Sequence, residues 1–219
     1  MEKSETVFQK AIEVLSSRML SALGGYYIWK WMEQARNTNN LGGLDKANRN
    51  LNIFNRHLAF FGQIIKSTYK SFVIDLAFFF DKEGYENSLS INKLLDLGRD
   101  KFSDDDITEI KKQIFEIKQK QGKNIALILE LRTADVAHQE LDSRSRHVLY
   151  ENIEALFKAV QEILNMITMK YDRSEHWWNH VEKEVNRQMD WVMNNLEKGE
   201  NVRIKEIENK YKVTLNNKP

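Results

Sequence analysis

The sequence predicts an all-α protein, an antiparallel bundle of helices, and three observations favour this class. Proline, which breaks helices, occurs once among the 219 residues, as the last residue. Long stretches are rich in Leu, Ile, Glu, Lys and Gln, which are good helix formers. Apolar residues recur at steps of three or four, the spacing of one helical face. Since 42% of the residues are hydrophobic and 30% charged, a packed core with a polar surface is expected.

The first part of the chain is expected to hold two long helical stretches. One helix runs from about residue 4 to 23, the pair Gly24-Gly25 loosens it, and an aromatic helical segment follows. The stretch "NTNNLGGLD" is typical of a loop, and its last residue, Asp45, is a plausible helix N-cap. A single long helix is then predicted from about residue 46 to 80, because apolar residues follow the helical period throughout.

Shorter helices follow in the middle of the chain. Ser90 is placed to cap a short helix, and Gly98 comes directly after it. Ser103 marks the start of the next helix and Gly122 its end. A strongly apolar helix is expected from residue 124 to about 139.

Two helices are predicted in the last third. Ser145 can cap the first, which carries a regular apolar face, and Ser174 can cap the second. Beyond Gly199 the sequence is charged and only weakly patterned. The expected organisation is a helical bundle over residues 1–172, followed by a C-terminal helical extension and tail over residues 173–219.

Composition excludes several classes of function. The formal net charge is +1, so no overall field attracts the chain to nucleic acid or membrane, and DNA is not an expected partner. The absence of cysteine excludes disulfides, thiolate nucleophiles and cysteine-ligated zinc. The opening residues lack the apolar core of a signal peptide, and the longest apolar run, "FVIDLAFFF", is too short to span a membrane. A soluble, cytoplasmic protein without a membrane partner is expected.

The stretch "IALILELRTADVAHQELD" carries the main candidate site. Arg132 lies at the end of a very apolar segment, and His138 follows six residues later. A buried arginine is costly unless it is paired. One interpretation is structural: Arg132 forms an ion pair with a neighbouring helix, and His138 bonds to backbone at a helix end. The alternative is a phosphate site, since cationic residues follow closely, namely Arg144, Arg146 and His147.

The residues "LRTADVAHQELD" resemble the signature of the HEPN superfamily, an arginine followed after four to six residues by a histidine. The upstream block "SFVIDLAFFFDKEGYENSLSINKLL" is similar to the abortive-infection U-type branch of that superfamily, in which an Asp follows a long helix and a "SLSI" segment comes next. The resemblance covers roughly residues 5–170. It implies a HEPN-like bundle that forms a homodimer, with two Arg/His pairs facing each other across a cleft.

The resemblance also implies an activity: a metal-independent endoribonuclease of an abortive-infection or toxin-type phage-defence system, leaving a 2′,3′-cyclic phosphate. His138 would transfer a proton and Arg132 would neutralise charge on the phosphoryl oxygens. Thr133 would orient them, although this position is usually Asn, Asp or His in active members. RNA binding would fall to the cationic residues that follow, Arg144, Arg146 and His147. No cofactor is expected.

Two alternatives remain open. The chain could be a catalytically inactive HEPN dimer that binds RNA, a nucleotide or a protein partner in the same cleft, which Thr133 favours. It could also be a structural bundle in which Arg132 is only salt-bridged. An antitoxin or regulatory protein is a further possible partner of the toxin-type alternative.

Other patterns are explained without function. His176 and His180 in "HWWNH" fall four residues apart, one face of a helix, but no second cluster offers further ligands, so no metal site is expected. The aromatic group is expected to pack in the bundle or its dimer interface; its members are Tyr26, Tyr27, Trp29 and Trp31. The run of residues 104–106, all Asp, suits the first turn of a helix. His57 has no evident partner.

Overall fold

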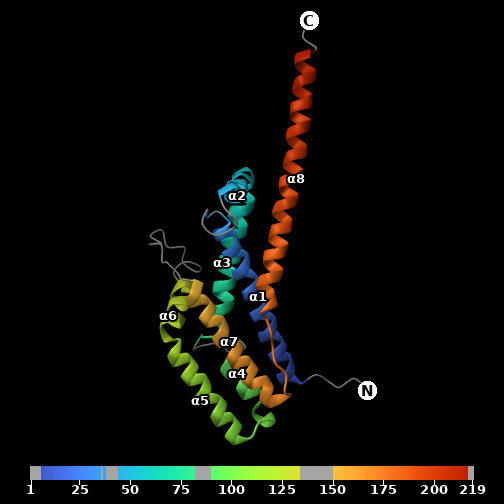
Figure 1. Ribbon diagram of the computed structural model, residues 1–219. Helices are drawn as coiled ribbons and strands as arrows, with labels where there is room; N and C mark the ends of the chain where they lie inside the picture. The colour runs from blue at the N-terminus through green and yellow to red at the C-terminus, as the bar shows by residue number, and fades with distance from the viewer. Residues whose placement is uncertain (1–5, 36, 38–43, 82–89, 134–149, 217–219) are drawn as a thin grey trace, which may run out of the picture. The chain divides into compact units, whose positions relative to one another are not determined.

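The computed structural model describes residues 6–35, 37, 44–81, 90–133 and 150–216, and the described part is all-α (Figure 1). The predicted fold class is confirmed, and no strand occurs among the described residues. The helices are α1 (Val7–Gln34), α2 (Leu44–Arg56), α3 (Leu58–Phe78), α4 (Ile91–Leu97), the 3-10 turn η1 (Arg99–Lys101), α5 (Asp104–Lys120), α6 (Gly122–Leu131), α7 (Tyr150–Tyr171) and α8 (His180–Asn216). None of these described helices has the length and apolarity that crossing a bilayer requires.

Two predicted helix starts are confirmed with their caps. The Ser90 side chain accepts a hydrogen bond from the Lys93 N–H at the start of α4, and Gly98 ends that helix. Ser103 forms a capping box with Asp106 at the start of α5, so each satisfies a backbone N–H of the other. These starts were predictable because a capping side chain acts within its own turn.

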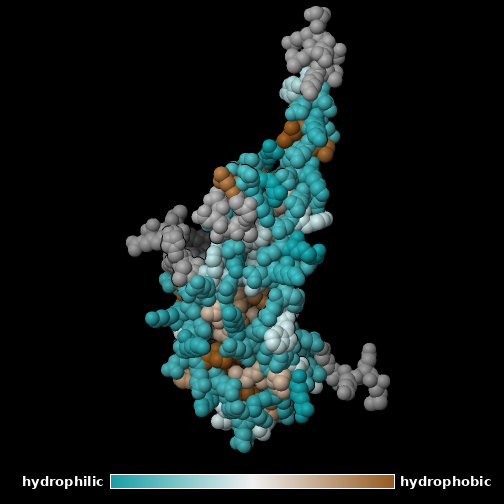
Figure 2. Space-filling view, in the orientation of Figure 1, coloured by the Kyte–Doolittle hydropathy of each residue, from teal (hydrophilic) through white to brown (hydrophobic). Residues whose placement is uncertain are grey.

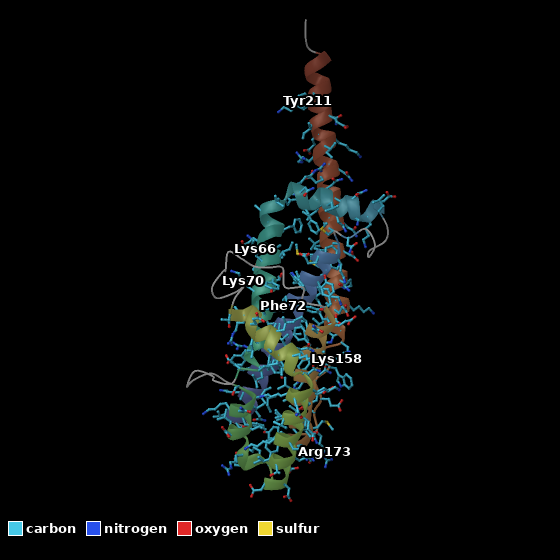
Figure 3. All side chains as sticks on the ribbon, turned by 90° about the vertical axis from the view of Figure 1, so that its left-hand side faces the viewer. Lys66, Lys70, Phe72, Lys158, Arg173 and Tyr211 are labelled. Carbon is cyan, nitrogen blue, oxygen red and sulfur yellow. The ribbon has the colours of Figure 1, made fainter. Side chains whose placement is uncertain are left out.

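The predictions for the first half differ from the structure in three ways. Helix α1 continues through Gly24-Gly25 without interruption. Asp45 lies inside the first turn of α2 instead of capping it. The helix predicted over residues 46–80 is divided at His57 into α2 and α3, and Figure 3 shows α2 turned across the start of α3. The bend brings the Phe54 and Phe61 rings into edge-to-face contact, with their centroids 4.6 Å apart, and both rings belong to a local core.

The later helices also differ from prediction. Gly122 was expected to end a helix, but it is the first residue of α6. Only Gln121 lies between α5 and α6, so no loop separates the two helices. Helix α8 begins at His180, after residues 174–178, which have no regular secondary structure, and it runs through Gly199 to Asn216. The proposed cap Ser174 therefore lies outside any helix. The proposed cap Ser145 lies outside the described residues.

The chain divides into two compact units, each made of two separate stretches. The first unit comprises Met1–Tyr26 and Lys66–Val181. Within it, α7 packs against α5 and α6. The regular apolar face predicted for this helix is buried in α7, and it consists of Ile153, Leu156, Phe157, Val160, Ile163, Leu164 and Ile167. The boundary predicted between residues 172 and 173 stays a prediction.

The second unit comprises Tyr27–Ile65 and Glu182–Pro219. Its core consists of Trp31, Met32, Ala35, Ile53, Phe54, Phe61 and Met193. Cations from α1 and α2 pair with acidic residues of α8, as Lys30–Glu182, Lys46–Asp190, Arg49–Glu197 and Arg56–Glu200. The expectation that His57 lacks a partner was wrong, because its Nε2 lies 3.7 Å from Glu200. Beyond Glu200 α8 is largely exposed, and its exposed hydrophobic residues include Val202 and Ile207. Figure 2 shows hydrophobic surface on this part of the helix.

Candidate active site at the end of α6

The carboxyl end of α6 presents Arg132 at the edge of the first unit's core. Ile128 and Leu131, on the preceding turn, are buried and fix the helix against its neighbours. Arg132 and Thr133 continue the helix in a wider, π-type turn, a deviation that is frequent at functional sites. The Arg132 side chain keeps 32% of its surface exposed. Its guanidinium is therefore held by the fold and reachable from solvent.

Asp81 is the partner that orients Arg132. An Nη1–H of Arg132 donates to Oδ2 of Asp81, a residue 51 positions earlier in the chain. Asp81 directly follows α3 and the buried pair Phe79 and Phe80. Because these two rings anchor the backbone, the carboxylate has a defined place. No other hydrogen bond or ion pair of Arg132 occurs among the described residues, so four of its five N–H groups remain available there.

Thr133 is exposed, and its hydroxyl is engaged within its own helix. Its Oγ1–H donates to the carbonyl oxygen of Leu129, at 3.0 Å. This is the common back-bond of a helical threonine to the residue four positions earlier. The hydroxyl oxygen retains an acceptor lone pair, but its proton is committed to the backbone.

The remaining predicted site residues lie outside the described part of the chain: His138, Arg144, Arg146 and His147. Both flanks of residues 134–149 are anchored in the first unit. At one flank Arg132 contacts Asp81. At the other, the Tyr26 hydroxyl donates its proton to Oε1 of Glu154 at 3.0 Å, and the Tyr150 carbonyl oxygen lies 3.4 Å from the same hydroxyl. The buried Tyr26 ring packs on Phe72 of α3, with ring centroids 5.5 Å apart.

Residues considered for other sites have structural roles. His176 lies in the irregular segment before α8 and not on a helix with His180, which corrects the predicted spacing on one helical face. Its ring stacks on Trp178, and its backbone is held by Asn165. Among the described residues, no three His, Asp or Glu side chains are grouped to hold a metal ion. Of the aromatic group, Tyr26 and Trp31 are buried, whereas Tyr27 and Trp29 are partly buried.

Sequence reasoning missed Asp81 as part of the site. Its position in the block "FFFDKEG" contributed only to the resemblance, and nothing in the spacing linked it to Arg132. The usable signal was an acidic residue placed directly after a long apolar helix. A buried run ending in a carboxylate favours a cationic partner at the same end of the bundle.

Comparison with known proteins gives one match. The model of the family HEPN_AbiU2, described as AbiU2, matches residues 8–193. The match extends past residue 170, where the resemblance was expected to end, and includes the start of α8. None of the curated proteins and none of the solved structures matches this chain.

Proposed function

The chain belongs to the HEPN_AbiU2 family, and from that membership we propose that it is a metal-independent endoribonuclease. The family itself indicates an abortive-infection function of the HEPN type. The proposed reaction is attack of a ribose 2′-oxygen on the adjacent phosphorus, with departure of the 5′-oxygen and formation of a 2′,3′-cyclic phosphate. His138 transfers a proton at one of the two oxygens.

Arg132 is proposed to stabilise the charge that develops on the phosphoryl oxygens. A guanidinium presents a planar fork of donors that matches a phosphate. A donor placed at such a charge contributes on the order of a hundredfold or more to the rate. The observation that supports this role is the half-exposed Arg132 held at one edge by Asp81.

Energetics favour this role over a purely structural ion pair. Each side chain of the Arg132–Asp81 pair is 32% exposed. Pairs this accessible contribute about 0–1 kcal/mol to stability. A leucine or methionine would stabilise the helix end as well, so stability alone is a weak reason for an arginine here.

The second candidate function is a catalytically silent dimer that binds RNA, a nucleotide or a protein partner through the same residues. The back-bond of Thr133 to Leu129 favours it, because a side chain whose proton is committed to its own helix orients a substrate or a histidine less well. Under both proposals the chain acts as a homodimer, and an antitoxin or regulatory protein is a further proposed partner. RNA contacts are proposed for Arg144, Arg146 and His147.

The decisive experiment is a cleavage assay on mixed cellular RNA with EDTA present, comparing the natural chain with His138→Ala. Cleavage by the natural chain alone, with cyclic-phosphate ends, is expected. Equal helical circular dichroism of the two proteins controls for folding. If both proteins bind RNA and neither cleaves it, the result would favour the catalytically silent dimer over the nuclease. Loss of cleavage in EDTA would contradict the metal-independent mechanism.

A further inference from the structure

Helix α3 carries a basic face formed by Lys66 and Lys70. Counting 100° per residue, Lys66, Lys70, Val73 and Ala77 fall within roughly 60° of one another on one side of the helix. Val73 and Ala77 are buried, whereas Lys66 is exposed and Lys70 half-exposed. This side of α3 therefore passes from core to solvent between Val73 and Lys70. The two lysines lie where the packed part of the first unit ends.

Neither lysine is neutralised within the described chain. No hydrogen bond or ion pair engages the Lys66 or Lys70 ammonium group among the described residues. The only acidic residue of α3 is Asp75, on the opposite side of the helix, where it pairs with Arg18. The face thus keeps two positive charges, in a chain whose net charge is only +1.

Both flanks of the candidate site are tied to the part of the chain that follows the two lysines, in the second half of α3 and directly after it. Phe72, on which Tyr26 packs, follows Lys70 by two residues along α3, although the two side chains point about 160° apart around the helix. The Tyr26 hydroxyl lies 3.4 Å from the Tyr150 carbonyl oxygen at the second flank. The first flank, Arg132, is tied to Asp81 after the end of α3. Figure 3 shows Lys66 and Lys70 on the same side of α3, above the end of α6 at which Arg132 lies.

We infer that Lys66 and Lys70 bind the phosphate backbone of an RNA strand that leads to Arg132. The inference rests on the proposed function, because it names the surface that would hold the substrate of the same site. One helical turn separates the two lysines by about 6 Å along the axis, so they can contact successive or nearby phosphates of one strand. Such contacts position a strand without reading its sequence.

The test measures RNA binding as a function of salt. The probe is a fluorescein-labelled single-stranded 12-mer of uridine, bound to full-length protein carrying His138→Ala so that cleavage does not interfere. The test variant adds Lys66→Ala and Lys70→Ala. The matched control adds Lys123→Ala and Lys158→Ala, which remove two other exposed lysines, one at the far end of α6 and one on α7.

We expect weaker binding of the test variant only, with a smaller dependence on salt. Each lost phosphate contact lowers the slope of log affinity against log salt by about 0.7 for a single strand. The slope is therefore expected to fall by about 1.4 in the test variant and to stay unchanged in the control.

The outcomes separate this inference from the function on which it rests. Equal affinity and slope in the two variants, with RNA bound and cut by the natural chain, would overturn the role of the lysines and leave the nuclease intact. No binding and no cleavage by the natural chain would overturn both. Unchanged thermal unfolding of the test variant excludes a folding defect, which is not expected at two solvent-facing positions.

Discussion

At the scale of single residues, the site depends on one contact between distant positions. Arg132 was predictable from the sequence, because an arginine at the end of an apolar run needs a partner or a function. Asp81 was not predictable, since the two residues are far apart in the chain and only the tertiary structure of the first unit brings the residues after α3 and α6 together. The role of His138 is implied by the resemblance to the HEPN signature and stays a prediction, which the cleavage assay tests.

Replacing Asp81 by Asn should separate positioning from stability. The amide lacks the charge that holds the Arg132 guanidinium, so we expect cleavage to fall by about tenfold to a hundredfold, as for a misplaced catalytic group. The melting temperature should change little, because the pair is half exposed. Asp81→Glu, which keeps the charge, should recover part of the rate. Equal losses of rate in both variants would contradict a positioning role.

Asp75 gives a prediction about pH. Burial raises the pKa of its carboxyl above the ordinary value, and the nearby Arg18 offsets only part of this effect. A raised pKa in the folded state means that protonation stabilises the fold at low pH, and that this contribution is lost as pH rises through the raised value. Ionised Asp75 therefore costs stability at pH 7.

Asp75→Asn should accordingly keep or raise the melting temperature at pH 7. Near pH 3 the carboxyl is protonated in both states and resembles an amide, so the difference should vanish. Thermal unfolding followed by circular dichroism at the two pH values measures this. A loss of stability that is larger at pH 7 than at pH 3 would show that the Arg18 pair outweighs the burial of the charge.

At the scale of elements, the sequence predicted helices well where local chemistry decides their limits, as at Ser90 and Ser103. It failed where packing decides. No proline or glycine lies at the bend at His57 to indicate it, and the late start of α8 follows an irregular segment whose backbone is held by Asn165. Both features depend on contacts with residues distant in sequence.

The pair Gly24-Gly25 illustrates the same limit and can be tested. Glycine was predicted to loosen the helix, yet α1 continues through both residues. A Cβ at Gly24 would meet no atom within 4 Å, whereas one at Gly25 would lie 3.3 Å from the Thr68 carbonyl oxygen of α3. Gly25 therefore allows close approach of the two helices.

We expect Gly24→Ala to stabilise the protein by about 0.5–1 kcal/mol, the ordinary gain for alanine over glycine inside a helix. Gly25→Ala should gain less or lose stability, because the backbone of α3 must move. Urea unfolding of the two variants provides the comparison. Equal gains would show that α3 adjusts without cost and that Gly25 has no packing role.

At the scale of the whole molecule, the second unit needs both of its stretches. Its core joins Trp31 and Phe54 to Met193 of α8, and four cations of the first stretch pair with α8. A chain ending after Asp172 would leave this core uncovered. We expect that chain to aggregate or to lose helical signal beyond the residues removed, whereas a chain ending after Lys205, within the exposed part of α8, should fold normally. Normal folding of the shorter chain would instead support residues 173–219 as a separable extension.

The proposed homodimer is also a property of the whole molecule. Light scattering should give twice the 25.9 kDa mass of one chain. Cleavage per chain should fall on dilution into the range where the dimer dissociates, because the proposed site needs two facing Arg/His pairs. A monomer with full activity would contradict the shared cleft.

The ion pair between Asp81 and Arg132 also constrains which substitutions can accumulate at these two positions during evolution. A mutation that removes Asp81 alone leaves the Arg132 guanidinium without the carboxylate that orients it. A mutation that removes Arg132 alone leaves an unpaired carboxylate next to buried aromatic rings. Loss of the aspartate alone is thus disfavoured while the arginine is in use, and a chain that has lost the arginine has no reason to keep the aspartate. In homologues of this chain, positions 81 and 132 should therefore vary together. Homologues that lack the arginine at position 132 should also lack the aspartate at position 81.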